Sequence, residues 1–302
     1  MTEIRTLIRR RKRMDGLFMA AGVATTFVGL VVLGTLIADL VASGAGRLTW
    51  SFLTSFPSRF AAQAGILAAW VGTALVMLIT MAAAVPLGVA AGIYLEEYAP
   101  RTWLTDLIEI NIANLAGVPS IIYGLMALGL FVYQLRLGFS ILTGGLTLAL
   151  LVLPIVIMAT REAIRAIPAS IREAAYALGA TKWQMVRDHV LPYAAGGIAT
   201  GVIIAMSRAI GETAPLITVG ALAFIAFLPP APWQAHFPFV SFEWLWAPFT
   251  VLPIQLFNWV SRPDPAFRQN AAAAGIVLIA MTLAMNALAI WLRARARRRV
   301  KW

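Results

Sequence analysis

The stretch REAIRAIPASIREAAYALGATKWQMVRDHVLP, residues 161–192, is a polar interruption in a very apolar chain, and it decides how that chain folds. Apolar runs flank it on both sides, at 146–159 and 193–206. Pro168 and Gly179 divide it into two short pieces, because proline does not continue a helix and glycine readily adopts the turn conformation. The pattern predicts a short amphipathic helical hairpin at a membrane surface, placed between two membrane spans.

The first piece of this hairpin is predicted to be a helix with one face of small and apolar side chains. Ser170 is placed to cap the helix, and Glu173, three residues later, can complete a capping box. Residues at helical spacing then form a face on which another protein can dock: Ile171, Ala174, Ala175 and Leu178. Such a hairpin suits the transmission of movement better than it suits chemistry.

These residues resemble the EAA loop of binding-protein-dependent ABC importer permeases. The triplet EAA at 173–175 is followed, at the family's spacing, by Gly179 and by the pair LP at 191–192. His189 stands where the family usually has a branched aliphatic residue, a departure that concerns local packing. In that family the loop docks into a groove on a separate ATP-hydrolysing subunit. The resemblance therefore implies a role in ATPase coupling for Glu173, Ala174, Ala175 and Gly179.

The composition indicates a chain that is solvated by lipid. Of the 302 residues, 61% are hydrophobic and 12% are charged, whereas a soluble domain carries about 25% charged residues. A net charge of +11 would suggest nucleic acid as the partner of a soluble protein. Here the basic residues cluster beside apolar runs, so we predict an all-α integral membrane protein that binds no nucleic acid.

The apolar runs predict six transmembrane helices. They lie at about 17–41, 65–94, 111–133, 139–160, 193–227 and 271–292. Each is long enough for a hydrocarbon core of ~30 Å, and the first exceeds the roughly 7–15 residues of a signal-peptide core. We therefore read it as a retained helix.

The positive-inside rule orients these helices. Both termini and the segments 94–109 and 161–192 are placed on one side, which then holds 18 of the 24 Lys and Arg residues. The remaining six are Arg47, Arg59, Arg136, Arg208, Arg262 and Arg268. This arrangement predicts a bacterial inner-membrane protein with both termini in the cytoplasm, whose flanking basic residues contact anionic membrane lipid.

The chain is accordingly predicted to have three parts. Residues 1–64 hold a basic cytoplasmic start, the first helix and an outer loop. Residues 65–292 form a permease core with five helices, the cytoplasmic coupling loop 161–192 and an outward-facing loop at 227–270. Residues 293–302 are a basic cytoplasmic tail.

The fifth run contains two charged residues, Arg208 and Glu212, within SRAIGETAPLI at 207–217. They are four residues apart, so they share one face of a helix and can pair. Gly211 and Pro215 are expected to loosen the helix around Glu212. A charge at membrane depth costs at least ~2.5–3.5 kcal/mol on insertion scales, and it therefore faces a partner or a water-filled pathway.

Two interpretations of this pair remain open. It is either a structural ion pair that orients helices or a site on a translocation pathway, where Arg208 attracts an anion and Glu212 restrains it. Guanidinium matches the oxygens of a tetrahedral oxyanion well. The two charges do not by themselves indicate which anion passes.

SRAIGETAP, together with VLPIQLFNWVSRPDPAF at 251–267, resembles phosphate-importer permeases of the PstA type, which have the MetI-like permease fold. The likeness covers most of the chain after about residue 65, and it implies a role in phosphate passage for Arg208 and Glu212. It also implies partners: an ATP-binding subunit in two copies, a second related permease subunit and an extracytoplasmic phosphate-binding protein. A permease for sulfate, molybdate or phosphonate is an alternative, as is an ATP-independent channel or carrier.

The residue patterns do not predict an enzyme. The sequence has no GxxxxGK[ST] loop, so ATP hydrolysis is expected on a separate chain. The chain lacks cysteine, and His189 and His236 are far apart in sequence, so neither a metal nor a cofactor is expected. Glu96 and Glu97 are adjacent and diverge on a helix, and a solvated loop is the expected place for them.

One segment has two interpretations. Residues 239–260 are apolar enough for a seventh span, but their prolines, tryptophans and Glu243 favour a re-entrant or interfacial helix. A seventh span would also place one basic terminus outside the cell.

Overall fold

The computed structural model describes residues 2–233 and 239–297, and these are mostly helical. Five of the described helices are long and apolar enough to cross a membrane: α1 (Thr2–Gly44), α3 (Leu67–Ile93), α6 (Ile141–Arg165), α9 (Leu191–Ala209) and α12 (Ala266–Arg297). A bent pair, α4 (Trp103–Leu115) and α5 (Ser120–Ala127) with its π-helical continuation to Gln134, is apolar and long enough for a sixth when its two pieces are counted as one span. The prediction of an all-α protein with six membrane spans is therefore confirmed.

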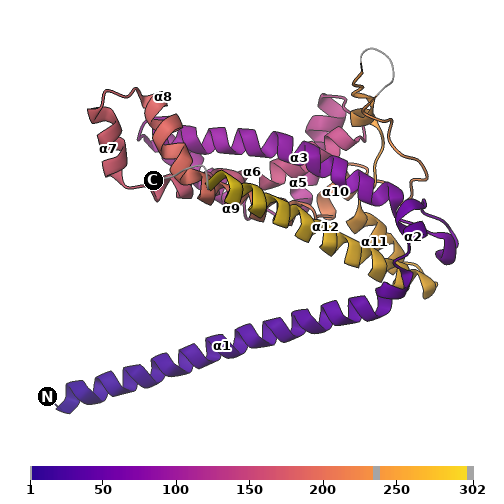
Figure 1. Cartoon of the computed structure of the whole chain (residues 1–302), viewed down its shortest axis with the longest axis horizontal. Helices are drawn as coiled ribbons and strands as arrows, with labels where there is room; N and C mark the ends of the chain where they lie inside the picture. The colour runs from indigo at the N-terminus through magenta and orange to yellow at the C-terminus, as the bar shows by residue number, and fades with distance from the viewer. Residues whose placement is uncertain (1, 234–238, 298–302) are drawn as a thin grey trace.

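Four of these helices lie side by side in one long bundle, α3 with α6, α6 with α9, and α9 with α12 (Figure 1). The hairpin of α7 (Ala169–Ala177) and α8 (Lys182–Gln184) lies at one end of the bundle. At the opposite end lie α2 (Trp50–Thr54) and α11 (Leu252–Val260). The start of α1 and the end of α12 both lie toward the hairpin end (Figure 1), while His236 and residues 298–302 of the basic tail lie outside the described residues.

Small residues bring the bundle helices into close contact. A methyl group added at Gly145 of α6 would lie 2.5 Å from Ile79 of α3, and Thr80 of α3 donates a hydrogen bond to the Gly145 carbonyl at 3.1 Å. Between α6 and α9, a methyl group added at Gly201 of α9 would clash with Cβ of Ala159. Packing through small residues is the usual way in which helices associate in lipid.

Helix α1 contacts α12 near its own C-terminal end, and toward its N-terminus it diverges from the bundle (Figure 1). Its apolar window is 0% buried, so large apolar side chains such as Phe27 and Leu36 are exposed along it. The hydroxyls of Thr25 and Thr26 donate to carbonyls one turn earlier in the same helix. This surface therefore offers lipid no unsatisfied hydroxyl at those two positions.

The third predicted span, 111–133, is wrong as a single helix. Helices α4 and α5 meet at 108° across a break at residues 116–119. Pro119 precedes α5 and disfavours helical backbone in the residue before it, which explains the break. Residues 94–109, which the charge pattern places on the same side as the hairpin, comprise a π-helical extension of α3 (Tyr94–Tyr98) and the first half of α4.

The fifth predicted span, 193–227, is displaced toward the hairpin. The apolar helix runs from Lys182 to Ala209 through a π-helical segment (Met185–Val190) and α9. It stops where Gly211 and Pro215 occur, and only the short α10 (Ala214–Thr218) follows before the extended outer segment. The expected loosening around Glu212 is therefore a complete helix end.

The segment 239–260 does not form a seventh span. Its only regular helix of more than one turn, within the described part, is α11, which has nine residues. Nine residues reach about 14 Å at 1.5 Å per residue, half of the ~30 Å hydrocarbon core. Trp259 on α11 is fully buried between Phe52 of α2 and Phe267 of α12. This short helix thus closes the end of the bundle opposite the hairpin.

Candidate functional site

The hairpin has a defined turn between its two helices. Gly179 has φ = +82°, which is in the left-handed region. Its N–H donates to the Tyr176 carbonyl at 2.9 Å, and the next N–H, of Ala180, donates to the Ala175 carbonyl at 3.1 Å. These two bonds form a Schellman motif, for which glycine at this position is strongly preferred. The structure therefore gives Gly179 a conformational role in shaping the hairpin.

The predicted cap of α7 is wrong, and a capping box occurs on the other helix. Pro168 precedes α7, and no side chain caps the helix, because the chain enters it one residue before Ser170. Thr181 instead caps α8, where its hydroxyl accepts from the N–H of Gln184 at 3.3 Å and Gln184 Oε1 accepts from the Thr181 N–H at 2.8 Å. This capping box fixes the start of α8, directly after the turn of the hairpin.

The outward face of α7 differs in part from the predicted one. Glu173 and Ala174 are exposed, and Leu178 is 86% exposed at the tip of the hairpin. Ala175, predicted as part of the docking face, is instead 2% exposed and lies in a core. That core joins the hairpin to the bundle and contains Ile164, Ile167, Ala175, Met185, Val186, Val190 and Ala194.

A network of six charged side chains lies at the base of the hairpin. We refer to it as the charge network, and it consists of Glu96, Glu97, Glu109, Arg161, Arg165 and Arg172. At its centre the Arg161 side chain is 4% exposed and contacts Glu109 of α4 at 2.5 Å and Glu96 at 3.5 Å. Because a buried charge requires a partner, Arg161 fixes α6 against both α4 and the end of α3.

The other arginines of the charge network tie the hairpin to α3. Arg165 contacts Glu96 through two hydrogen bonds, at 3.0 and 3.2 Å. Arg172 of α7 contacts Glu97 at 2.8 Å and also donates to the carbonyls of Ile164 and Ile167. The expectation of a solvated loop for the two glutamates is wrong, since the side chain of Glu97 is 7% exposed and that of Glu96 is 17% exposed.

The predicted pair of Arg208 and Glu212 is present. Arg208 lies in the last turn of α9 and Glu212 lies just after it, with Nε and Oε1 3.4 Å apart. The side chain of Arg208 is 42% exposed and that of Glu212 is 18% exposed. Among the described residues Arg208 has no other hydrogen-bond partner. Most donors of this guanidinium are therefore available to an anion.

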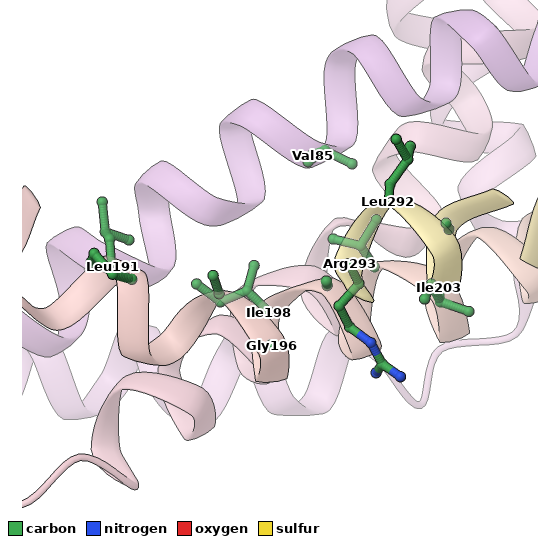
Figure 2. A pocket seen from close by; sticks show the side chains of 12 residues that line it. Val85, Leu191, Gly196, Ile198, Ile203, Leu292 and Arg293 are labelled. Atoms are coloured by element: carbon green, nitrogen blue, oxygen red, sulfur yellow. The ribbon is translucent and has the colours of Figure 1, made fainter. Parts of the chain in front are cut away.

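A groove of about 540 Å³ lies between α3, α9 and α12, but its chemistry does not suit an anion (Figure 2). Apart from Arg293, the residues that line the groove are apolar, among them Val85, Ile198 and Leu292. The guanidinium of Arg293 points away from α3 and donates to the Thr200 hydroxyl at 2.5 Å. This mostly apolar groove therefore does not provide a second candidate site for an anion.

The charge network is the part of the site that sequence patterns missed. Its members are 52 to 75 residues apart where they pair (Glu109 with Arg161 and Glu97 with Arg172). The usable signal was the coincidence of three glutamates after the second run with three arginines after the fourth. In the sequence, these charged residues indicate only the orientation of the spans.

Comparison with known proteins agrees with this architecture. Residues 84–302 match the family described as "Binding-protein-dependent transport system inner membrane component". The chain is 33% identical over 281 residues to the phosphate transport system permease protein PstA of Yersinia pestis, covering 92% of this chain and 90% of that protein. It is 31% identical over 286 residues to the probable ABC transporter permease protein YqgI of Bacillus subtilis, covering 93% and 94%.

The fold is similar to that of a solved chain of the MetNI methionine ABC transporter, in an inward-facing conformation. The TM-score is 0.54 at 17% sequence identity, covering 76% of this chain and 95% of that chain. The likeness confirms the predicted MetI-like fold. Together with the match over residues 84–302, it shows that this chain belongs to the family of binding-protein-dependent ABC transporter permeases of the inner membrane.

Proposed function

We propose that the chain is the permease subunit of an ATP-driven importer of inorganic phosphate. The observation that carries the proposal is the guanidinium of Arg208, which lies at the end of a membrane helix with a single long contact to Glu212 at 3.4 Å. A guanidinium presents donors in a planar fork that matches the oxygens of phosphate. The printed name of the Yersinia pestis relative specifies phosphate transport, whereas that of YqgI names no substrate.

In this proposal Arg208 attracts the anion and Glu212 restrains it. The carboxylate holds the guanidinium when no anion is present, and it competes with the anion for the same donors. Competition weakens binding, and weak binding is required at a transport site because the ion must also leave. Phosphate would then pass to the cytoplasm by exchanging with the carboxylate.

The hairpin supplies the proposed contact with an ATP-binding subunit, expected in two copies. Glu173, Ala174 and Leu178 are exposed on it and are available to a partner. A second related permease and an extracytoplasmic phosphate-binding protein complete the proposed assembly, the latter meeting the outer segment around 227–270. In the proposed assembly, both termini lie in the cytoplasm of a bacterial cell, and the basic flanks contact anionic lipid.

Uptake measurements test the substrate and the energy source together. We expect the assembled transporter in proteoliposomes to accumulate labelled phosphate only when ATP is enclosed in the vesicle lumen, on the side where the ATPase subunits lie. Excess unlabelled phosphate should abolish the signal, while sulfate, molybdate and methylphosphonate should leave at least half of it. Equal competition by one of those anions would assign the alternative substrate. Uptake without an ATPase subunit would support a channel or carrier instead.

Glu173→Lys is expected to uncouple the transporter. The substitution inverts a charge on the exposed face of α7. It removes no side-chain hydrogen bond or ion pair, because Glu173 forms none within the described residues. We expect phosphate uptake per ATP hydrolysed to fall about tenfold while the permease still assembles in the membrane. Asp106→Lys is the matched control, since Asp106 is an exposed carboxylate on α4 that lies outside the hairpin and the charge network. Normal coupling in Glu173→Lys would count against docking through this face.

A further inference from the structure

We infer that the elbow between α4 and α5 transmits movement of the hairpin to the Arg208–Glu212 pair, with Tyr123 as the residue that keeps the elbow stiff. The inference rests on the proposed function and adds a mechanism by which the anion site opens. Helices α4 and α5 contact the charge network at one end and the segment after Glu212 at the other.

The first contact joins α4 to the base of the hairpin. Glu109 of α4 contacts Arg161 of α6 at 2.5 Å, and Arg161 is 4% exposed. The same arginine contacts Glu96, which also binds Arg165 at 3.0 Å. Because the buried guanidinium cannot lose both carboxylates without a large desolvation cost, movement of α6 at this point carries α4 with it.

The elbow itself is held at its angle by one buried hydrogen bond. Tyr123 of α5 is 4% exposed, and its hydroxyl donates to the carbonyl of Leu115, the last residue of α4, at 2.8 Å. The bond bridges the break at 116–119, across which the helices bend by 108°. The Leu115 carbonyl also accepts from the Val118 N–H at 3.1 Å, so the Tyr123 hydroxyl is its second donor and adds a side-chain link between the two arms.

The second contact joins α5 to α10, whose backbones pack closely at Gly124. A methyl group at Gly124 would lie 1.9 Å from Thr218 Oγ1 and 2.7 Å from Cα of Pro215. The backbones of α5 and α10 are therefore in direct contact, and Leu216 of α10 is 1% exposed beside them. Since α10 begins two residues after Glu212, displacement of α5 displaces the segment that carries this carboxylate.

The two members of the charge pair are consequently held by different elements. Arg208 belongs to the helix that runs without interruption from Lys182 of the hairpin, whereas Glu212 follows the end of that helix and is tied to α10 and α5. Movement of α6, which carries α4 and α5 with it, relative to α9 therefore changes the distance between them. Opening the pair frees the guanidinium for an anion, and closing it returns the carboxylate as a competitor.

Tyr123→Phe tests the brace with the least change in shape. In the transporter assembled with its ATPase, we expect phosphate uptake per ATP hydrolysed to fall about fivefold while ATP hydrolysis itself stays within twofold of normal. Tyr133→Phe is the matched control, because Tyr133 is 66% exposed on the same bent span. Glu109→Gln tests the other end of the elbow, with Asp106→Asn, an exposed carboxylate on the same helix, as its control.

A distance measurement gives a readout that a merely structural role would not alter. The chain has no cysteine, so spin labels can be placed uniquely at Ile217→Cys on α10 and Leu288→Cys on α12, which are 49% and 57% exposed. The label-to-label distance is expected to change between nucleotide-free and ATP-trapped transporter. That change should be lost in Tyr123→Phe and kept in Tyr133→Phe.

The outcomes separate the elbow from the function on which it rests. An unchanged distance shift together with normal coupling in Tyr123→Phe would overturn the inference and leave phosphate import untouched. Because the distance shift requires ATP but no substrate, it tests the elbow even if phosphate proves to be the wrong anion. If Tyr123→Phe does not assemble, Glu109→Gln decides the matter by the same two measurements.

Discussion

Arg208→Ala is expected to lower phosphate uptake about 100-fold while leaving the assembled complex intact. The substitution removes a guanidinium whose hydrogen bonds to a charged ligand contribute about 1.5–3 kcal/mol each, and about 2.8 kcal/mol corresponds to 100-fold. It also leaves Glu212 alone, which repels an anion. The measurement is the initial rate of labelled phosphate uptake, with the amount of complex quantified in the same membranes.

Two further variants distinguish a pathway site from a structural ion pair. Exchanging the charges, as Arg208→Glu with Glu212→Arg, restores a structural pair but not an anion site, so uptake should remain low. Arg268→Ala is the matched control, since Arg268 is an exposed arginine at the outer end of α12. Recovery of uptake in the exchanged variant would establish the structural interpretation and refute the pathway role.

Arg161→Ala is expected to lower the free energy of unfolding by about 3–5 kcal/mol, the usual effect of removing one partner of a buried ion pair. The reason is that Glu109 would remain without its cation at the base of the hairpin, while Glu96 would keep only Arg165. Thermal unfolding of the detergent-solubilised protein measures the change. Arg187→Ala is the control, because Arg187 is 57% exposed and pairs only with its neighbour Asp188.

A double substitution separates the charge from the volume of Arg161. Arg161→Met with Glu109→Gln removes both opposing charges and keeps side chains of similar size. Replacing a buried ion pair by uncharged groups is often neutral for stability, so most of the lost stability should return. If the double variant unfolds as readily as Arg161→Ala, the network is not stabilised by charge pairing.

The span count followed from the sequence because hydropathy reports directly on transfer into lipid. The backbone breaks did not follow, because they depend on tertiary contacts. The elbow at 116–119 is stabilised by Tyr123 and Leu115, and nothing local to Pro119 distinguishes a bend of 108° from a mild kink. Proline within α3 and α6 produced no such break, at Pro86 and Pro154.

The candidate site was only partly predictable for a related reason. Arg208 and Glu212 are close in sequence and unusual in lipid, so their pairing could be inferred from spacing. The charge network joins residues from different spans, and charges at span ends were interpreted only as orientation signals. Ala175 had the right residue type for a docking face, but the direction of its side chain depends on how the hairpin folds back onto the bundle.

The isolation of α1 has a consequence for biogenesis. This helix is synthesised before α12, the helix that it contacts, so it must reside in the bilayer before that contact can form. Its apolar side chains point in all directions, and the hydroxyls of Thr25, Thr26 and Thr35 are satisfied by its own backbone. Insertion of α1 is thus an autonomous step, and a nascent chain arrested after residue 44 should already be integrated in the membrane.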